Sequence, residues 1–354
     1  MKKFKCLSVL VVAALALSAT SCQNDSWDFP DYDYTTVYFS YQYPVRTIVL
    51  GEDTEYDLSL DNEHKCKIMA TMGGVYKNTL DRTLHVSLDD DLCKDIAFAD
   101  ETGSQGSTLK VMPSNYYSLP SDMTIVIPKG QIAGGMTVQL NDAFFNDPDA
   151  IKNMYVIPLR INSVEKADSV LSGKSIQADP NIHKPNEWIS VPKNYILYCV
   201  KYVNPWHATY LRRGKDVGVG KNGDTSLDVE YKRDAAYIEK NELCHLKTLS
   251  MNEVEVSLKT KQSDNKDLPF TLILTFDDNG NCTVKEPSGA SYTVTGSGKF
   301  VKKGDKNSWG GEDRDAIFLD YKIDFANVEY TITDIMTVRD RGIIKEEFSP
   351  YVIE

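Results

Sequence analysis

The sequence predicts an all-β protein with two domains, an antiparallel β-sandwich followed by an antiparallel β-barrel. Short runs of β-branched and aromatic residues alternate with Gly, Pro, Asn and Asp turn signals, and no stretch shows a clear helical period. The length of 354 residues suits two domains. The chain also holds 20 Tyr against 12 Phe and 4 Trp, and Tyr favours half-buried strands and wet binding faces.

The charge balance is acidic, with 39 basic and 51 acidic residues. Nucleic-acid binding requires a basic footprint, which this composition does not provide. Direct adhesion to an anionic membrane surface is disfavoured for the same reason.

Residues 1–21 have the three parts of an export signal. Three lysines are followed by the apolar run 7–17, which is too short to span a bilayer, and then by the small residues 19–21. Cys22 comes directly after them. This arrangement resembles a bacterial lipobox, although the family pattern prefers Leu where this chain has Ala19. The resemblance implies that Cys22 is lipidated and that residues 22–34 form a tether.

The tether is acidic and aromatic, with Asp25, Trp27 and Asp28 close behind Cys22. Acidic residues in this place resemble the surface-export signal of Bacteroidetes lipoproteins. The resemblance implies an outer-membrane protein held by its lipid anchor and displayed at the cell surface. The alternative is a cleaved, soluble, secreted protein in which Cys22 is a spare thiol.

Five further cysteines follow: Cys66, Cys93, Cys199, Cys244 and Cys282. Their number is odd and none forms a Cys-x-x-Cys pair, so neither a disulfide framework nor a zinc motif is predicted. Their spacing does not determine whether any single disulfide forms.

The first domain is predicted over residues 35–165. Its expected strands are 36–41, 46–50, 64–72, 83–88, 122–127, 136–140 and 154–161. Four phrases, MPSNYY (112–117), IPKG (127–130), FFND (144–147) and YVIPLR (155–160), resemble an immunoglobulin-like module of Bacteroidetes surface lipoproteins. That module of unknown function is also found ahead of surface family 18 endoglycosidases.

Residues 166–193 lose β character and gain Pro and polar residues, which predicts a linker. The second domain is then expected over 194–354. Its predicted strands are 195–203, 209–213, 227–231, 245–250, 253–259, 270–276, 283–286, 291–300, 315–325 and 328–338. Asn279-Gly280 is a strong hairpin signal between two of them.

Four phrases of this half carry a second resemblance: KYVNPWHATYLRRG (201–214), GSGKF (296–300), SWGG (308–311) and VRDRG (338–342). They are similar to the C-terminal domain that accompanies the first module in such lipoproteins. That resemblance implies a lipocalin-like β-barrel and a setting among glycan-acquisition proteins. It implies no established activity.

No catalytic or metal-binding residues and no cofactor are predicted. Glycosidase chemistry requires two spaced carboxylates, one with a raised pKa, whereas Glu312, Asp313 and Asp315 cluster in one Gly-rich loop. The loops 89–91 and 147–149 are read as solvated turns, with weak Ca²⁺ binding as the alternative. Residues 277–281 resemble the start of an EF-hand loop, but the Gly comes two positions early and no Glu stands at the twelfth position, so a Ca²⁺ loop is rejected.

The candidate ligand-binding residues are Trp206, Tyr210, Arg212, Arg213 and Trp309, since sugars require aromatic faces beside planar polar groups. Leu211 is expected to point inward, so Tyr210 and Arg212 are expected to point outward; a wet lumen would invert this arrangement. A structural alternative is that Trp206 closes the barrel floor with Arg339 or Arg341 stacked on it.

The sequence therefore favours a non-catalytic lipoprotein that binds glycan for a neighbouring importer or endoglycosidase. Three alternatives stay open: a structural or protein-interaction subunit of an outer-membrane complex, a lipocalin-like carrier of a small ligand, and a hydrolase.

Overall fold

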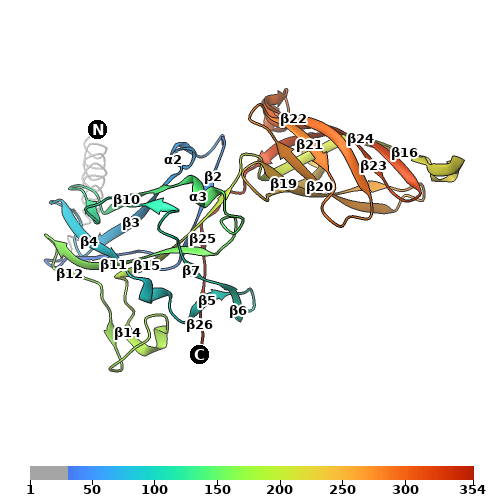
Figure 1. Cartoon of the computed structure of the whole chain (residues 1–354). Coiled ribbons are helices and arrows are strands. Elements are labelled where there is room, and N and C mark those ends of the chain that lie inside the picture. Colours follow the sequence, from blue (N-terminus) through green and yellow to red (C-terminus); the bar gives the residue numbers. More distant parts are fainter. Residues whose placement is uncertain (1–30) are drawn as a thin grey trace, which may run out of the picture.

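The computed structural model describes residues 31–354 and confirms the all-β prediction, with 52% of residues in strands and 8% in helices (Figure 1). The predicted export signal, Cys22 and most of the tether lie outside the described residues. Within the described range, no helix is long and apolar enough to cross a membrane.

The first domain is a sandwich of two main sheets. One sheet contains, in spatial order, β12 (Ser169–Val170), β1 (Thr36–Tyr38), β3 (Lys65–Gly73), β10 (Ala133–Leu140) and β8 (Tyr117–Ser118). The other contains β25 (Glu346–Glu347), β2 (Pro44–Val49), β15 (Tyr195–Val203), β11 (Tyr155–Glu165), β4 (Arg82–Leu88) and β9 (Thr124–Ile127), with β7 (Lys110–Val111) beside β11.

The sandwich core forms where the alternating apolar residues of the two sheets face each other. Ile68 and Val138 come from the first sheet, and Leu84 and Ile157 come from the second. All four side chains are fully buried. Strands β3, β10 and β4 alternate between buried and less buried residues with period 2, whereas β11 is buried on both faces around Ile157.

The remaining elements are short. Two small sheets contain β26 (Pro350–Val352), β5 (Ile96–Ala99) and β6 (Gln105–Thr108), and β13 (Lys174–Ser175) and β14 (Trp188–Ser190). The helices are α2 (Ser59–Asn62), α3 (Asp142–Phe145) and the 3-10 turns η1 (Asp90–Cys93), η2 (Pro185–Glu187), η3 (Lys221–Gly223), η4 (Thr225–Leu227), η5 (Ile238–Lys240) and η6 (Trp309–Gly311).

The predicted boundary between the domains at residue 194 is wrong. Strand β15 was expected to open the second domain, but it lies in the first, parallel to β2 and antiparallel to β11. Seven of its nine residues are buried, which is typical of a central strand covered on both faces. The predicted linker 166–193 packs on this same domain, where the Leu171 amide donates to the Val37 carbonyl at 3.1 Å and the Phe39 amide donates to the Lys193 carbonyl at 2.9 Å.

The C-terminal tail also returns to the first domain. Strand β25 pairs with β2 and β26 pairs with β5, far from the barrel (Figure 1). The local sequence shows strands in both places, but it does not show which partners their backbone groups find. The barrel is therefore an insertion between β15 and β25.

The barrel has eight antiparallel strands that close on themselves, as predicted. They are β16 (Ala208–Gly220), β18 (Glu242–Thr248), β19 (Glu253–Lys261), β20 (Asp267–Phe276), β21 (Asn281–Lys285), β22 (Thr293–Asp305), β23 (Arg314–Asp324) and β24 (Val328–Asp340). Pairing of β16 with β24 closes the ring, and β17 (Val229–Arg233) continues the edge along the second half of β16.

All five cysteines of the described chain are free. Burial raises the pKa of four of these thiols, those of Cys66, Cys199, Cys244 and Cys282, to about 12. A thiol with such a high pKa is neutral and unreactive, so these residues pack as small hydrophobic side chains.

The corrected boundary predicts how fragments of the chain will fold. A fragment of residues 204–342 holds the complete barrel and should unfold cooperatively in a circular-dichroism melt. A fragment of residues 31–193 lacks β15, whose buried side chains contribute on the order of 10 kcal/mol. That loss is comparable with the whole stability of a domain, so this fragment should show no cooperative transition. A cooperative melt of fragment 31–193 would contradict the assignment of β15.

Candidate functional site

The structure places two of the five candidate ligand residues inside the barrel. Tyr210 and Arg212 on β16 are completely buried, so the expectation that they point outward is wrong. Leu211 is buried as well, on the opposite face of the strand. Because both faces of β16 are covered here, apolar alternation could not tell the interior face from the exterior one.

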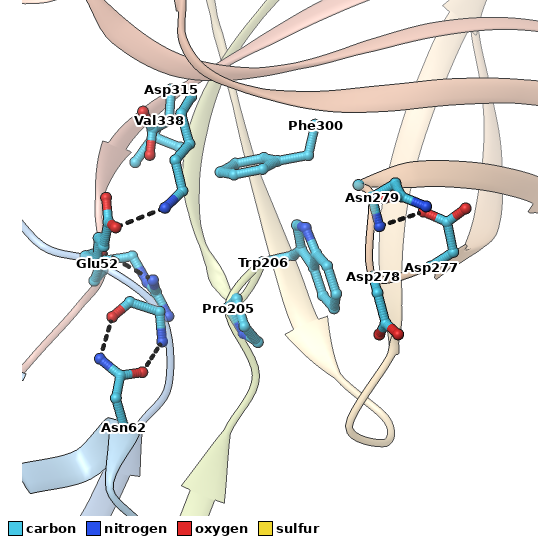
Figure 2. Close-up of a pocket in the computed structure, with 14 residues that line it drawn as sticks. Glu52, Asn62, Pro205, Trp206, Asp277, Asp278, Asn279, Phe300, Asp315 and Val338 are labelled. Atoms are coloured by element: carbon cyan, nitrogen blue, oxygen red, sulfur yellow. Dashed lines mark hydrogen bonds and ion pairs between the residues drawn. The ribbon is translucent and has the colours of Figure 1, made fainter.

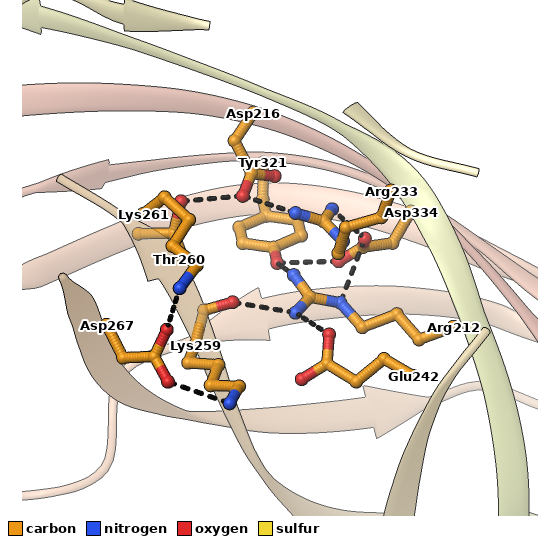
Figure 3. A network of polar contacts seen from close by, with 10 residues as sticks. All are labelled: Arg212, Asp216, Arg233, Glu242, Lys259, Thr260, Lys261, Asp267, Tyr321 and Asp334. Atoms are coloured by element: carbon orange, nitrogen blue, oxygen red, sulfur yellow. Dashed lines mark hydrogen bonds and ion pairs between the residues drawn. The ribbon is translucent and has the colours of Figure 1, made fainter. Parts of the chain in front are cut away.

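Arg212 is at the centre of a buried polar network (Figure 3). Its Nε donates to Asp334 Oδ1 at 3.0 Å, and its Nη1 donates to Glu242 Oε2 at 3.1 Å and to the Lys259 carbonyl at 2.9 Å. Tyr321 donates to the other oxygen of Asp334 at 2.7 Å. Residues from five strands are therefore joined through one guanidinium and one carboxylate.

A second arginine extends this network toward the far end of the barrel. Arg233 Nη2 donates to Asp334 Oδ1 at 2.6 Å, and its Nη1 pairs with Asp216. Thr260 donates to the same Asp216 carboxylate at 2.6 Å. Burial alone would raise the pKa of Asp334, but the two arginines outweigh burial and lower it. Asp334 thus stays ionised between two buried cations.

Arg213 points to the other face of β16 and has a structural partner there. Its Nη1 and Nη2 donate to the two oxygens of Asp305 at 2.8 and 2.6 Å. Ser308 and Thr337 donate to the same carboxylate. This bidentate pair fixes the end of β22 against β16, and Thr337 adds β24 to the same contact. Arg213 therefore has a structural role.

Trp206 has the position that the structural alternative predicted, but its stacking partner is different. The indole lies parallel to the Phe276 ring, with centroids 4.2 Å apart and planes 8° apart. Tyr210 donates to the Trp206 carbonyl at 2.9 Å. Trp206 therefore closes the barrel end nearest the first domain, stacked on a phenylalanine rather than on Arg339 or Arg341.

Arg341 instead joins the two domains. The buried guanidinium donates to the His207 carbonyl at 2.8 Å, the Asn204 carbonyl at 3.0 Å and the Leu50 carbonyl at 2.9 Å. Burial lowers its pKa. Gly51 lies directly against it with φ of +100°, and a Cβ there would stand 3.1 Å from Arg341 Nη1. A glycine is therefore required for this close approach.

A hollow of about 600 Å³ opens beside this junction, between the two domains (Figure 2). We call it the Trp206 hollow. It is lined by Gly51, Glu52, Asn62, Pro205, Trp206, Asp277, Asp278, Asn279, Gly280, Phe300, Lys302, Asp315, Val338 and Arg341. Figure 2 shows Trp206 and Phe300 between the Glu52 loop of the first domain and the turn that carries Asp278.

Aromatic and polar groups meet in the Trp206 hollow. The predicted Asn279-Gly280 turn is present, with Gly280 at φ of +76°, and Asp277 accepts the amides of Asn279 and Asn281. Asp278 of the same turn is exposed. Such a mixture of apolar walls and a few placed polar groups is typical of small-molecule sites.

A second hollow of about 550 Å³ adjoins the first, and we call it the Trp309 hollow. It shares Glu52, Asp315, Val338 and Arg341 with the Trp206 hollow. Trp309 lines it from the barrel, and Tyr56 lines it from the first domain. Of the five candidate ligand residues, Trp206 and Trp309 thus face one interdomain groove, which consists of the two hollows.

Several lining residues of the groove were not nominated from the sequence. Phe300 is in the GSGKF phrase and could have been noticed as an aromatic at a strand end. Glu52 and Tyr56 lie in the other domain, and no sequence pattern connects them with Trp206. These residues come close to Trp206 because Arg341, where the chain leaves the barrel, binds the Leu50 carbonyl of the first domain.

The acidic loop next to Trp309 has ordinary structural roles. Asp313 accepts from Lys306 at 2.9 Å and from the Asn307 amide at 3.1 Å, and these hydrogen bonds lower its pKa. Asp315 accepts the Lys303 amide at 2.7 Å. A general acid requires a raised pKa, so the geometry of Asp313 does not suit that role.

The acidic residues in the loops of the first domain are also paired with other side chains of the same chain. Asp89 pairs with Arg160, and Asp147 accepts the hydroxyls of Tyr116 and Tyr155 at 2.7 and 2.6 Å. Among residues 31–354, no group of three or more His, Cys, Asp or Glu side chains is arranged to hold a metal ion.

Two family models match parts of the chain. A family model described as a domain of unknown function (DUF5627) matches residues 205–342, and a second model, described as an N-terminal domain, matches residues 32–168. The first match covers the barrel as the structure bounds it. The comparison with curated proteins gave no match.

One similar solved structure is that of a protein of unknown function from Bacteroides ovatus. It is 41% identical, with a TM-score of 0.82, and the alignment covers 91% of this chain and 100% of that one. An auxiliary nutrient binding protein from Bacteroides thetaiotaomicron VPI-5482 is 13% identical with a TM-score of 0.32, over 83% of this chain and 90% of that one. That likeness is too low to support a conclusion.

The chain belongs to the family of the Bacteroides ovatus protein of unknown function. The expected kinship with Bacteroidetes proteins of unknown function is confirmed to this extent. The lipoprotein and endoglycosidase setting stays an expectation.

The Arg212 network predicts a large stability effect of one neutralised carboxylate. The Asp334→Asn substitution leaves Arg212 and Arg233 buried without their shared anion, so the free energy of unfolding should fall by about 3–5 kcal/mol. Urea unfolding followed by tryptophan fluorescence measures this change. The matched control is Asp320→Asn on the neighbouring strand, an exposed carboxylate whose loss should cost less than about 0.5 kcal/mol. Equal effects of the two substitutions would contradict the role of the network.

The Arg213–Asp305 pair predicts a pH dependence. Burial alone would raise the pKa of Asp305, but its hydrogen bonds from Arg213, Ser308 and Thr337 lower it from 3.8 to about 2. The carboxylate therefore stabilises the fold above the unfolded value of 3.8, and this stability is lost as the pH falls toward 2. At neutral pH, Asp305→Asn should cost about 1–3 kcal/mol. Urea unfolding from about pH 5 to about pH 2 should show the difference from wild type narrowing; a constant difference would refute this origin.

Proposed function

We propose that this protein is a non-catalytic surface lipoprotein of the outer membrane that binds glycan in the interdomain groove. It serves a neighbouring uptake or endoglycosidase system, and Cys22 carries its lipid anchor. The observation that supports glycan binding is the meeting of Trp206 and Phe300 with carboxylates in one open hollow.

The chemistry of a sugar ring suits this hollow. A pyranose presents apolar C–H groups on its faces, which pack on aromatic rings such as Trp206 and Phe300. Its hydroxyls donate to ionised carboxylates in strong, charge-assisted hydrogen bonds. Glu52, Asp278 and Asp315 supply such acceptors around the rings.

The barrel interior favours this groove over a central cavity as the ligand site. Buried apolar side chains, among them Leu272, Ile317 and Ile332, fill the barrel together with the Arg212 network. A lipocalin-like carrier requires an open lumen for its ligand. The packed interior therefore weighs against the carrier alternative.

The proposed lipid anchor at Cys22 is inferred from the sequence alone. The export signal and the acidic residues behind Cys22 support surface display, and residues 22–34 would separate the groove from the membrane. A glycan-binding protein in this position would hold polymer at the cell surface for other proteins to cleave or import.

Substitution of Trp206 tests the proposed site. Trp206→Ala should weaken binding to any glycan retained by the mature protein at least about 10-fold, because a central aromatic contributes about 1.4 kcal/mol or more. Glycan-array screening followed by isothermal titration calorimetry measures this. Since Trp206 also packs on Phe276, the exposed carboxylate variant Asp278→Ala is tested in parallel and should weaken binding without lowering the melting temperature.

The matched control is Tyr237→Ala, an exposed aromatic that does not line the groove. It should bind as wild type does. A folded protein that is retained by no glycan contradicts the proposal, and co-purification with an outer-membrane receptor would then favour the interaction-subunit alternative.

A further inference from the structure

The interdomain groove contains more than one aromatic site. Its two hollows, of about 600 and 550 Å³, share Glu52, Asp315, Val338 and Arg341 as common walls. Each hollow by itself has the volume of a typical small-molecule site, roughly 300–1,000 Å³. Together they provide two such sites in direct succession.

Each hollow has its own aromatic side chains. Trp206 and Phe300 line the first, and Trp309 and Tyr56 line the second. Tyr56 is 51% exposed. Glu52 of the first domain lines both hollows, and it forms an ion pair at 2.6 Å with Lys302 of the barrel, which lines the Trp206 hollow. Both partners of this pair are exposed, so their polar atoms remain accessible to hydroxyl groups of a ligand.

The charges of the groove disfavour an anionic ligand. In the Trp206 hollow, four carboxylates face Lys302 and Arg341. In the Trp309 hollow, six carboxylates face four basic side chains. Several of these cations already have partners: Lys302 pairs with Glu52, Arg314 pairs with Glu312, and Arg341 is bound by backbone carbonyls. An acidic sugar would meet net repulsion in both hollows.

We infer that the groove binds a neutral oligosaccharide of several residues in two subsites, one at Trp206 and Phe300 and one at Trp309 and Tyr56. This inference rests on the proposed glycan-binding function and specifies its ligand class. A chain that reaches both subsites turns the second contact into an intramolecular one, so affinity rises with chain length.

Titration calorimetry with oligosaccharide ladders tests the inference on the mature protein. The probes are neutral malto- and manno-oligosaccharides of one to six residues, and oligogalacturonides of the same lengths as the acidic counterpart. From disaccharide to hexasaccharide, the dissociation constant of at least one neutral ladder should fall at least 10-fold. Every oligogalacturonide should bind at least 10-fold more weakly than the neutral chain of its length.

Two variants test the second subsite, Trp309→Ala in the barrel and Tyr56→Ala in the first domain. Each should remove most of the dependence of affinity on oligosaccharide length, while the affinity for the disaccharide stays within about twofold of wild type. Trp206→Ala should weaken all lengths alike, and Tyr237→Ala should leave the whole series unchanged. Melting temperatures verify that each variant is folded.

The outcomes separate this inference from the proposed function. Binding of short sugars that depends on Trp206 but not on length, charge or Trp309 overturns the two-subsite inference and leaves the proposed function standing. Tighter binding of oligogalacturonides overturns the assignment to neutral chains. No binding of any ladder by the folded wild type overturns the inference, and the glycan array decides whether the proposed function fails with it.

Discussion

The contact of Arg341 with four backbone carbonyls is the constraint on which the two-domain structure depends. Its guanidinium donates to Leu50 and Glu52 of the first domain and to Asn204 and His207 at the start of the barrel. Backbone carbonyls cannot move independently of their strands, so one side chain fixes the loop after β2 against both strands that enter and leave the barrel. Arg341 also lines both hollows, so the same contact joins the two walls of the groove.

Asn204 holds the barrel side of the junction through hydrogen bonds of its side chain. Its side chain donates to the carbonyls of Ser250 and Glu253, both at 2.9 Å, and accepts the amides of Trp206 and His207. The residue between β15 and the barrel is therefore completely buried and fully bonded rather than a flexible hinge. This geometry turns Trp206 onto Phe276 and into the wall of the groove, which relates the fold of the junction directly to the candidate site.

The polar residues near Trp206 show why residue type alone misled the choice of ligand residues. Arg212 and Arg213 have the chemistry of ligand contacts, yet each is bound bidentately or through several bonds to protein groups. Their partners, Asp334 and Asp305, lie more than ninety positions away in the chain. A sequence shows that an arginine is present, but whether its charge is available depends on which carboxylate the fold brings to it.

The sequence by itself determined the β content, the sandwich and the barrel, because period-2 alternation and turn chemistry are local properties of the chain. The hairpin at Asn279-Gly280 and the buried faces of β3 and β4 follow from a few residues each. Only the tertiary structure decided that β15 and the tail belong to the first domain, since strand partners are chosen by long-range backbone pairing and burial. The groove was decided in the same way, because Glu52 and Tyr56 meet Trp206 and Trp309 only after the chain has left the first domain, formed the barrel and returned.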